Sequence, residues 1–110
     1  MARNLKLLVF PAKDIEKAKA FYNKFLGGEP YIDSPYYVGY KVGEQEVGLD
    51  PNSNVGPIVY VDVNDIKSGL DEMTKVGAEI VQDVKAVGGG LLVAQLKDAD
   101  GNIVGLRQQT

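Results

Sequence analysis

An internal repeat constrains this chain more than any other feature of its sequence. Residues 5–28 contain an apolar run, a short polar break and an amphipathic segment that ends at a glycine pair, and residues 57–77 repeat that order. Superposing the copies aligns Asp14 with Asp65, Ala18 with Gly69 and Tyr22 with Met73. Short predicted strands follow each copy. We therefore expect one domain made of two strand–helix–strand–strand–strand modules, at about residues 1–54 and 55–110.

Composition excludes several classes of function. The net charge of −3 comes with no basic cluster, so nucleic acid is not an expected partner. No apolar run approaches the ~20 residues of a membrane span, and we expect a cytoplasmic protein that does not bind membranes. Cysteine is absent, which removes disulfides and thiol chemistry. Histidine is absent too, so acid–base chemistry would need a carboxylate, a lysine or a tyrosine with a shifted pKa.

Hydrophobic periodicity places the elements of both modules. Two helices are predicted to begin after Asp14 and Asp65, whose side chains suit the N-cap position, and to end at Gly27 and Gly77. Their apolar stripes are Ile15, Ala18, Tyr22, Phe25 and Leu26 in the first helix, and Ile66, Gly69, Leu70, Met73 and Val76 in the second. The predicted strands are 5–10, 29–34, 36–42, 45–50, 58–63, 79–84, 91–96 and 103–108.

The hairpin of residues 36–50 has a predicted register. A two-residue loop at Gly43-Glu44 pairs Tyr40 with Val47, Val38 with Leu49 and Gly39 with Gly48. Because side chains alternate along a strand, one face of the hairpin is then apolar. The other face carries Tyr37, Gly39, Lys41, Glu46, Gly48 and Asp50.

Three motifs resemble the vicinal-oxygen-chelate superfamily, which contains glyoxalase I, extradiol dioxygenases, fosfomycin-resistance transferases and bleomycin-resistance proteins. They are Asp14-Ile15 through Ala20-Phe21-Tyr22 to Leu26-Gly27, Val63-Asn64-Asp65-Ile66 to Val76-Gly77-Ala78, and Asp98-Ala99-Asp100-Gly101-Asn102 before the last strand. The resemblance covers nearly the whole chain. It implies an α+β fold in which two βαβββ modules form an incompletely closed mixed β-barrel around a cavity, with the helices outside. It also implies a homodimer.

The metal site that the resemblance implies has no ligands here. Metalloenzymes of the superfamily carry histidine, glutamine or glutamate in the first and last strands of each module. When each of these metal-ligand positions is transferred to this sequence, they correspond to Leu7, Gly48, Ile58 and Gly105. None of these side chains offers the nitrogen, oxygen or sulfur donors that a divalent metal needs. We therefore expect no metal site and no cofactor, as in the metal-free branch of the superfamily.

The same face is predicted to line a pocket for a small organic ligand. The predicted ligand-binding residues are Leu7, Tyr36, Tyr37, Gly39, Gly48, Ile58, Tyr60, Gly105 and Arg107. Glycine in a strand often marks close approach of a ligand or of another backbone. The alternative is that the glycines only allow close packing and that the aromatic side chains fill the space.

Three functions remain open. The first is a binding protein of glyoxalase or bleomycin-resistance type that sequesters a drug-like or aromatic molecule unchanged. The second is a metal-independent lyase or isomerase of the same fold that uses a carboxylate or a tyrosine, with Glu46 and Asp50 as the weak catalytic candidates. The third is a structural or regulatory module without a working pocket.

Overall fold

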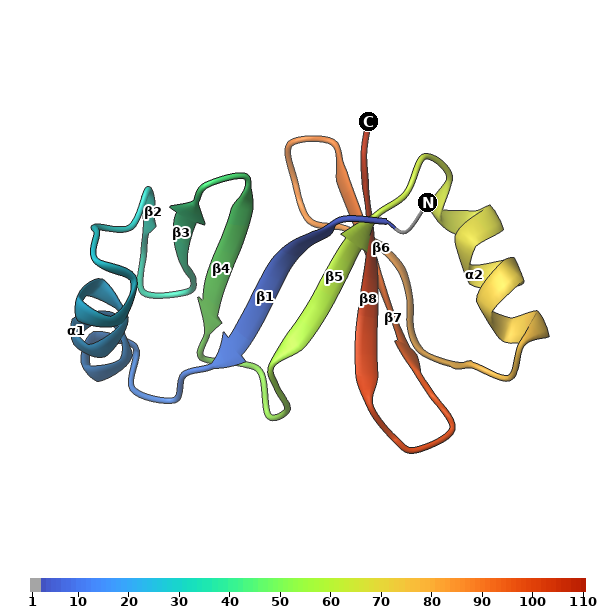
Figure 1. Cartoon of the computed structure of the whole chain (residues 1–110), viewed down its shortest axis with the longest axis horizontal. Helices are drawn as coiled ribbons and strands as arrows, with labels where there is room; N and C mark the ends of the chain where they lie inside the picture. Colours follow the sequence, from blue (N-terminus) through green and yellow to red (C-terminus); the bar gives the residue numbers. More distant parts are fainter. Residues whose placement is uncertain (1–2) are drawn as a thin grey trace. The chain divides into compact units, whose positions relative to one another are not determined.

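The computed structural model of the chain describes residues 3–110, in two compact units (Figure 1). Residues 6–58 form the first unit, and residues 59–110 form the second together with Leu5 and the described residues before it. Each unit has the order strand, helix, strand, strand, strand. The predicted α+β fold of two βαβββ modules is therefore confirmed.

The first unit contains a four-stranded arrangement with one helix. Its elements are β1 (Leu5–Pro11), α1 (Ile15–Leu26), β2 (Ile32–Asp33), β3 (Val38–Val42) and β4 (Gln45–Asp50). The strands run in the order β2-β3-β4-β1, with β1 parallel to β4 and the other neighbours antiparallel. The N-cap Asp14 accepts a hydrogen bond from the Lys17 backbone nitrogen at 3.1 Å. Gly27 ends the helix at φ 73°, a left-handed conformation that glycine adopts without strain.

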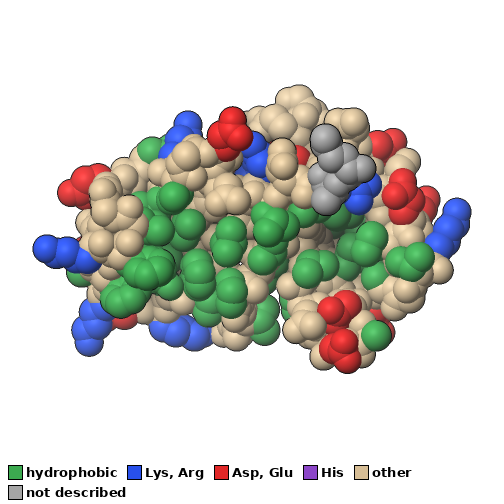
Figure 2. All heavy atoms as spheres, viewed as in Figure 1, with side chains coloured by type: hydrophobic (Ala, Val, Ile, Leu, Met, Phe, Trp, Pro, Cys, Tyr) green, Lys and Arg blue, Asp and Glu red, His purple; other side chains and the backbone are tan. Residues whose placement is uncertain are grey.

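The core of the first unit lies between α1 and one face of its strands. Val38, Tyr40, Val47 and Leu49 are buried there, and Ile15, Ala18, Tyr22 and Leu26 of α1 pack on them. The prediction that Phe25 belongs to the apolar stripe facing the core was wrong, because Phe25 is 70% exposed. Phe25 stacks on Phe21 with ring centroids 5.8 Å apart, and Figure 2 shows hydrophobic side chains gathered on the surface over α1.

The second unit repeats this topology. Its elements are β5 (Ile58–Asp62), α2 (Ile66–Lys75), β6 (Glu79–Ala86), β7 (Leu91–Lys97) and β8 (Ile103–Gln109). The order is β5-β8-β7-β6, with β5 parallel to β8. Ile66, Leu70, Ala94, Leu96 and Leu106 form its core beneath α2. Val76 lies one residue past α2 and is 77% exposed, so its predicted place on the buried stripe was wrong.

The predicted hairpin register is confirmed. Val38 pairs with Leu49, Gly39 with Gly48 and Tyr40 with Val47, around the two-residue loop at Gly43-Glu44. The strand starts later than predicted, however, at Val38. The Ser34 hydroxyl accepts from the backbone nitrogens of Tyr36 and Tyr37, and the Ser34 backbone nitrogen donates to the Tyr37 carbonyl. These bonds form a turn, since they occupy backbone groups that a strand would use.

Candidate functional site

In the second unit, one row of residues crosses the sheet on the face opposite α2. Tyr60 on β5, Gly105 on β8 and Gln95 on β7 are neighbours in register. A Cβ built on Gly105 would overlap the aromatic ring of Tyr60. The ring therefore lies over the glycine, and the Tyr60 hydroxyl accepts a hydrogen bond from Gln95 Nε2 at 2.9 Å. Tyr60 is only 7% exposed.

An ion pair occupies the next row of the same face. Asp62 pairs in register with Arg107, two residues beyond Tyr60 and Gly105. Arg107 Nε donates to Asp62 Oδ1 at 2.9 Å, a short charge-assisted bond. The Arg107 side chain is 11% exposed and the Asp62 side chain 43% exposed. The guanidinium and the Tyr60 phenol ring therefore lie in successive rows on one face of this unit.

The first unit has a matching glycine–tyrosine arrangement on the face opposite α1. Gly48 on β4 lies between Gly39 on β3 and Val9 on β1. A Cβ built on Gly48 would overlap the Tyr37 phenol, and one built on Gly39 would come within 3.3 Å of Tyr37 Cε2. The Tyr37 side chain thus covers both glycines. In each unit, a tyrosine ring fills the space that a side chain on the strand glycine would need.

Charged groups lie on this same face of the first unit. Lys41 and Glu46 are paired in register, and the Glu46 carboxylate accepts a hydrogen bond from the Tyr31 hydroxyl. The Lys41 ammonium lies 4.7 Å from the centre of the Tyr31 ring, within the range of a cation–π interaction. A carboxylate, a phenol and an ammonium group therefore form one chain of contacts.

The structure shows where the predicted site residues lie. Leu7, Gly39, Gly48, Ile58, Tyr60 and Gly105 are buried, and Tyr37 and Arg107 are half-buried. Tyr36 is 77% exposed. Of the two carboxylate candidates, Glu46 contacts Tyr31. The Asp50 carboxylate instead accepts a hydrogen bond from the backbone nitrogen of Asn52 at 2.8 Å, and this bond stabilises the turn after β4.

Gln95 is the residue that sequence reasoning missed. It was assigned to a strand but given no role. The signal was available in the pairing of the last two strands, since the antiparallel register places Gln95 opposite Gly105. An aromatic ring that lies over a strand glycine brings its hydroxyl within reach of a glutamine on the next strand. The Tyr60 hydrogen bond follows from that arrangement.

The described residues contain neither a helix suited to crossing a membrane nor a cluster of three or more acidic side chains placed to hold a metal ion. Of the predicted site residues, only Gly105 borders the cavity of about 330 Å³ in the second unit. That cavity lies on the α2 side of the sheet, among residues of the unit's core.

Comparison with known proteins places the chain in a family. The profile of the Glyoxalase/Bleomycin resistance protein/Dioxygenase superfamily matches residues 4–106. No curated protein sequence matches the chain.

Solved structures share the fold at low identity. Hypothetical protein BH1468 from Bacillus halodurans C-125 has a TM-score of 0.79 at 18% identity, covering 100% of this chain and 96% of that one. A glyoxalase/bleomycin resistance protein/dioxygenase superfamily member from Vibrio splendidus 12B01 scores 0.73 at 19% identity, covering 97% and 100%. Streptomyces coelicolor methylmalonyl-CoA epimerase, in complex with 2-nitronate-propionyl-CoA, scores 0.77 at 12% identity, covering 100% and 96%. By its sequence profile and its fold, the chain belongs to the Glyoxalase/Bleomycin resistance protein/Dioxygenase superfamily.

Proposed function

We propose that this protein binds a small organic molecule, of drug-like or aromatic character, without the metal ion used by metalloenzymes of its superfamily, and releases it unchanged. The observation that carries the proposal is the glycine–tyrosine pair in each unit. Gly48 and Gly105 stand at positions carried over from metal ligands, and Tyr37 and Tyr60 lie over them. Phenol rings provide apolar contact area in place of metal coordination, and the ring of Tyr60, which is 7% exposed, would have to move off Gly105 to contact a ligand.

Donor chemistry supports the metal-free part of this proposal. The other two carried-over positions hold Leu7 and Ile58, which are 8% and 3% exposed. Hydrocarbon side chains cannot coordinate a divalent cation, and glycine contributes no side chain at all. The residues present at these positions therefore do not fit a metal.

Polar groups beside Tyr60 suggest how a ligand would be oriented. Arg107 is held by Asp62 at 2.9 Å, so its guanidinium has a fixed direction. A few fixed polar groups among apolar and aromatic ones are typical of small-molecule sites. We propose that the ligand is planar and carries a group that accepts hydrogen bonds.

A ligand screen by thermal unfolding tests the proposal. A binder should raise the melting temperature equally in EDTA and in added Ni²⁺, Zn²⁺ or Mn²⁺, because binding to the folded state alone stabilises it. Tyr60→Leu should remove the rise if the ligand binds in the second unit, and Tyr37→Leu should remove it if the ligand binds in the first. Phe25→Leu, an exposed aromatic on α1, should retain the rise in either case. Loss of the rise in EDTA would contradict metal-free binding. A broad screen without any binder would favour a module that has no working pocket.

One observation favours an enzyme as the second candidate. The Tyr31 hydroxyl donates to the Glu46 carboxylate, and the Lys41 ammonium lies over the Tyr31 ring, so a chain without histidine has here a carboxylate and a phenol that could exchange a proton. An enzyme would consume a bound compound with time, and Glu46→Gln would abolish that consumption while leaving binding measurable. A compound recovered intact from wild-type protein after long incubation would exclude this candidate for that compound.

The expected homodimer also remains a proposal, based on the family resemblance. Sedimentation equilibrium over a range of protein concentrations would give the mass of the assembly directly.

A further inference from the structure

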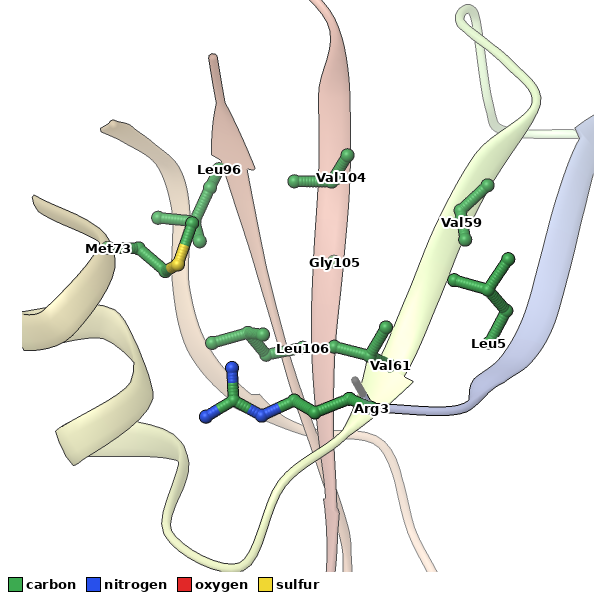
Figure 3. Close-up of a pocket in the computed structure, with 9 residues that line it drawn as sticks. All are labelled: Arg3, Leu5, Val59, Val61, Met73, Leu96, Val104, Gly105 and Leu106. Carbon is green, nitrogen blue, oxygen red and sulfur yellow. The ribbon is translucent and has the colours of Figure 1, made fainter. Parts of the chain in front are cut away.

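A cavity of about 330 Å³ lies in the second unit, between α2 and the sheet (Figure 3). Val59 and Val61 line it from β5, Val104 and Leu106 from β8, and Met73 from α2. These side chains carry hydrocarbon or a thioether. The cavity is therefore a site for apolar groups, on the opposite side of the sheet from Tyr60.

The internal repeat explains why this space is not filled. In the repeat alignment, Val61 corresponds to Phe10 and Met73 to Tyr22. In the first unit those two aromatic rings pack together, with centroids 5.3 Å apart. The second unit has the smaller, branched valine and the flexible methionine at the same places, and both border the cavity. These two differences between the halves thus contribute to the opening.

A cationic side chain lies at one end of the cavity. Among the residues that the structure describes, Arg3 is the charged one in the lining, and Figure 3 shows its side chain extending across that end toward α2. Its Nη2 is 3.7 Å from Glu72 Oε2, which is longer than a charge-assisted hydrogen bond of about 2.7–2.9 Å. The side chains are 46% and 65% exposed, so a competing anion can reach the guanidinium.

We infer that this cavity binds a medium-chain fatty acid, with the alkyl chain among the valine and leucine side chains and the carboxylate at Arg3. At about 30 Å³ for each water-sized group, the volume holds roughly ten heavy atoms. Octanoate has that size. A guanidinium prefers a carboxylate because its planar donors match two carboxylate oxygens. The inference is independent of Tyr37 and Tyr60, since neither residue lines this cavity.

Methionine labelling gives a direct readout. The chain contains two methionines, so protein labelled with ¹³C at the methionine methyl groups gives a two-signal spectrum, in which Met73→Leu assigns the cavity signal. Titration with octanoate should shift the Met73 signal with saturation. Octanol should bind more weakly because it lacks the charge, and octylammonium should not compete because Arg3 repels it.

Three variants locate the site. Arg3→Gln should weaken octanoate binding about fivefold, while Arg3→Lys should retain most of the affinity by keeping the positive charge. Val61→Phe introduces the residue type that Phe10 has at the corresponding position of the first unit, and it should abolish binding by filling the cavity. Phe25→Leu on α1 is the matched control outside the cavity. If Val61→Phe fails to fold, Val104→Phe replaces it, since that residue borders the same space.

Specific outcomes would overturn the inference. If Val61→Phe or Arg3→Gln binds octanoate as tightly as wild type does, the ligand binds elsewhere. An unchanged Met73 signal in saturating octanoate would exclude the site. A Met73 signal that shifts with protein concentration, and not with octanoate, would assign the cavity to contact with a second copy of the chain.

Discussion

Gly48 and Gly105 each lie beneath a tyrosine ring, and the absence of a side chain at these positions shapes the faces opposite the helices. The arrangement is tight at both. A methyl group on either glycine would occupy space that the ring already fills. Because folded interiors are closely packed, the ring would have to move to accept it.

Gly105→Ala is therefore expected to reduce the free energy of unfolding by about 1–3 kcal/mol, as measured by urea denaturation. The added methyl displaces the Tyr60 ring and strains its 2.9 Å hydrogen bond with Gln95. Gly28→Ala is the matched control, since a Cβ there meets nothing within 4 Å, and its effect should stay within about 0.5 kcal/mol. Adding Tyr60→Leu should relieve part of the loss. Equal stability of Gly105→Ala and wild type would contradict the packing described here.

Tyr40 offers a second prediction, concerning alkaline stability. Its side chain is 2% exposed, and its hydroxyl donates to Asn23 Oδ1 at 2.7 Å. Burial raises the pKa of the Tyr40 phenol, and the nearby Glu29 carboxylate raises it further. Because the folded pKa exceeds the unfolded value of about 10, the contribution of Tyr40 to stability is complete below pH 10. It is then lost as the pH rises through the folded pKa.

Tyr40→Phe should thus lower the free energy of unfolding by about 1 kcal/mol at pH 7, through loss of the hydrogen bond. Above pH 10, the stability of the variant should fall less steeply than that of wild type. Urea denaturation at closely spaced alkaline pH values measures both slopes. Parallel curves for the two proteins would show that Tyr40 titrates alike in the folded and unfolded states.

Among the elements, the helices depend on side chains at their first turns. Asp65 Oδ1 accepts from the Lys67 and Ser68 backbone nitrogens at 3.2 and 3.3 Å. Asp65→Ala removes both bonds and should cost about 1 kcal/mol of stability. Asp71→Ala, on the exposed side of the same helix, is the control and should change stability by less than about 0.5 kcal/mol. Equal effects of the two variants in thermal unfolding would argue against a capping role.

The elements could be predicted from the sequence because periodicity and capping agree in both halves. The prediction of elements from sequence fails where a side chain bonds to the backbone. It also fails for a helical residue that lies between the buried and the exposed face of its helix. Ser34 forms a turn through its hydroxyl, which shortened the predicted strand at Tyr36 and Tyr37. Helical periodicity alone placed Phe25 and Val76 at the edge of a buried stripe, but it does not tell how far the sheet extends beneath that edge.

Part of the candidate site could also be predicted from the sequence. Gly105 and Tyr60 could be chosen from the resemblance and from strand alternation, and their contact then followed from the parallel register of β5 and β8. The hydrogen bond from Gln95 depends on a ring leaning across a neighbouring strand. The cavity beside Met73 depends on side-chain volume summed over several elements. Neither property is expressed in the spacing of residues along the chain.

At the level of the whole molecule, the repeat supplies two copies of one topology with different interiors. The first unit packs Phe10 against Tyr22 under its helix, whereas the second has Val61 and Met73 and leaves a cavity. Both units share the tyrosine over a strand glycine on the opposite face. Because each module packs its own core beneath its own helix, one copy can change its interior without changing the other's.

The proposed function depends on binding without a metal ion, and native mass spectrometry during titration with Ni²⁺, Zn²⁺ and Mn²⁺ tests this most directly. Protein purified without chelator should show the mass of the unliganded chain or of its organic complex, and added metal should produce only weak, non-stoichiometric adducts. One ion bound per chain at micromolar concentration, and displaced by EDTA with loss of ligand binding, would contradict the proposal.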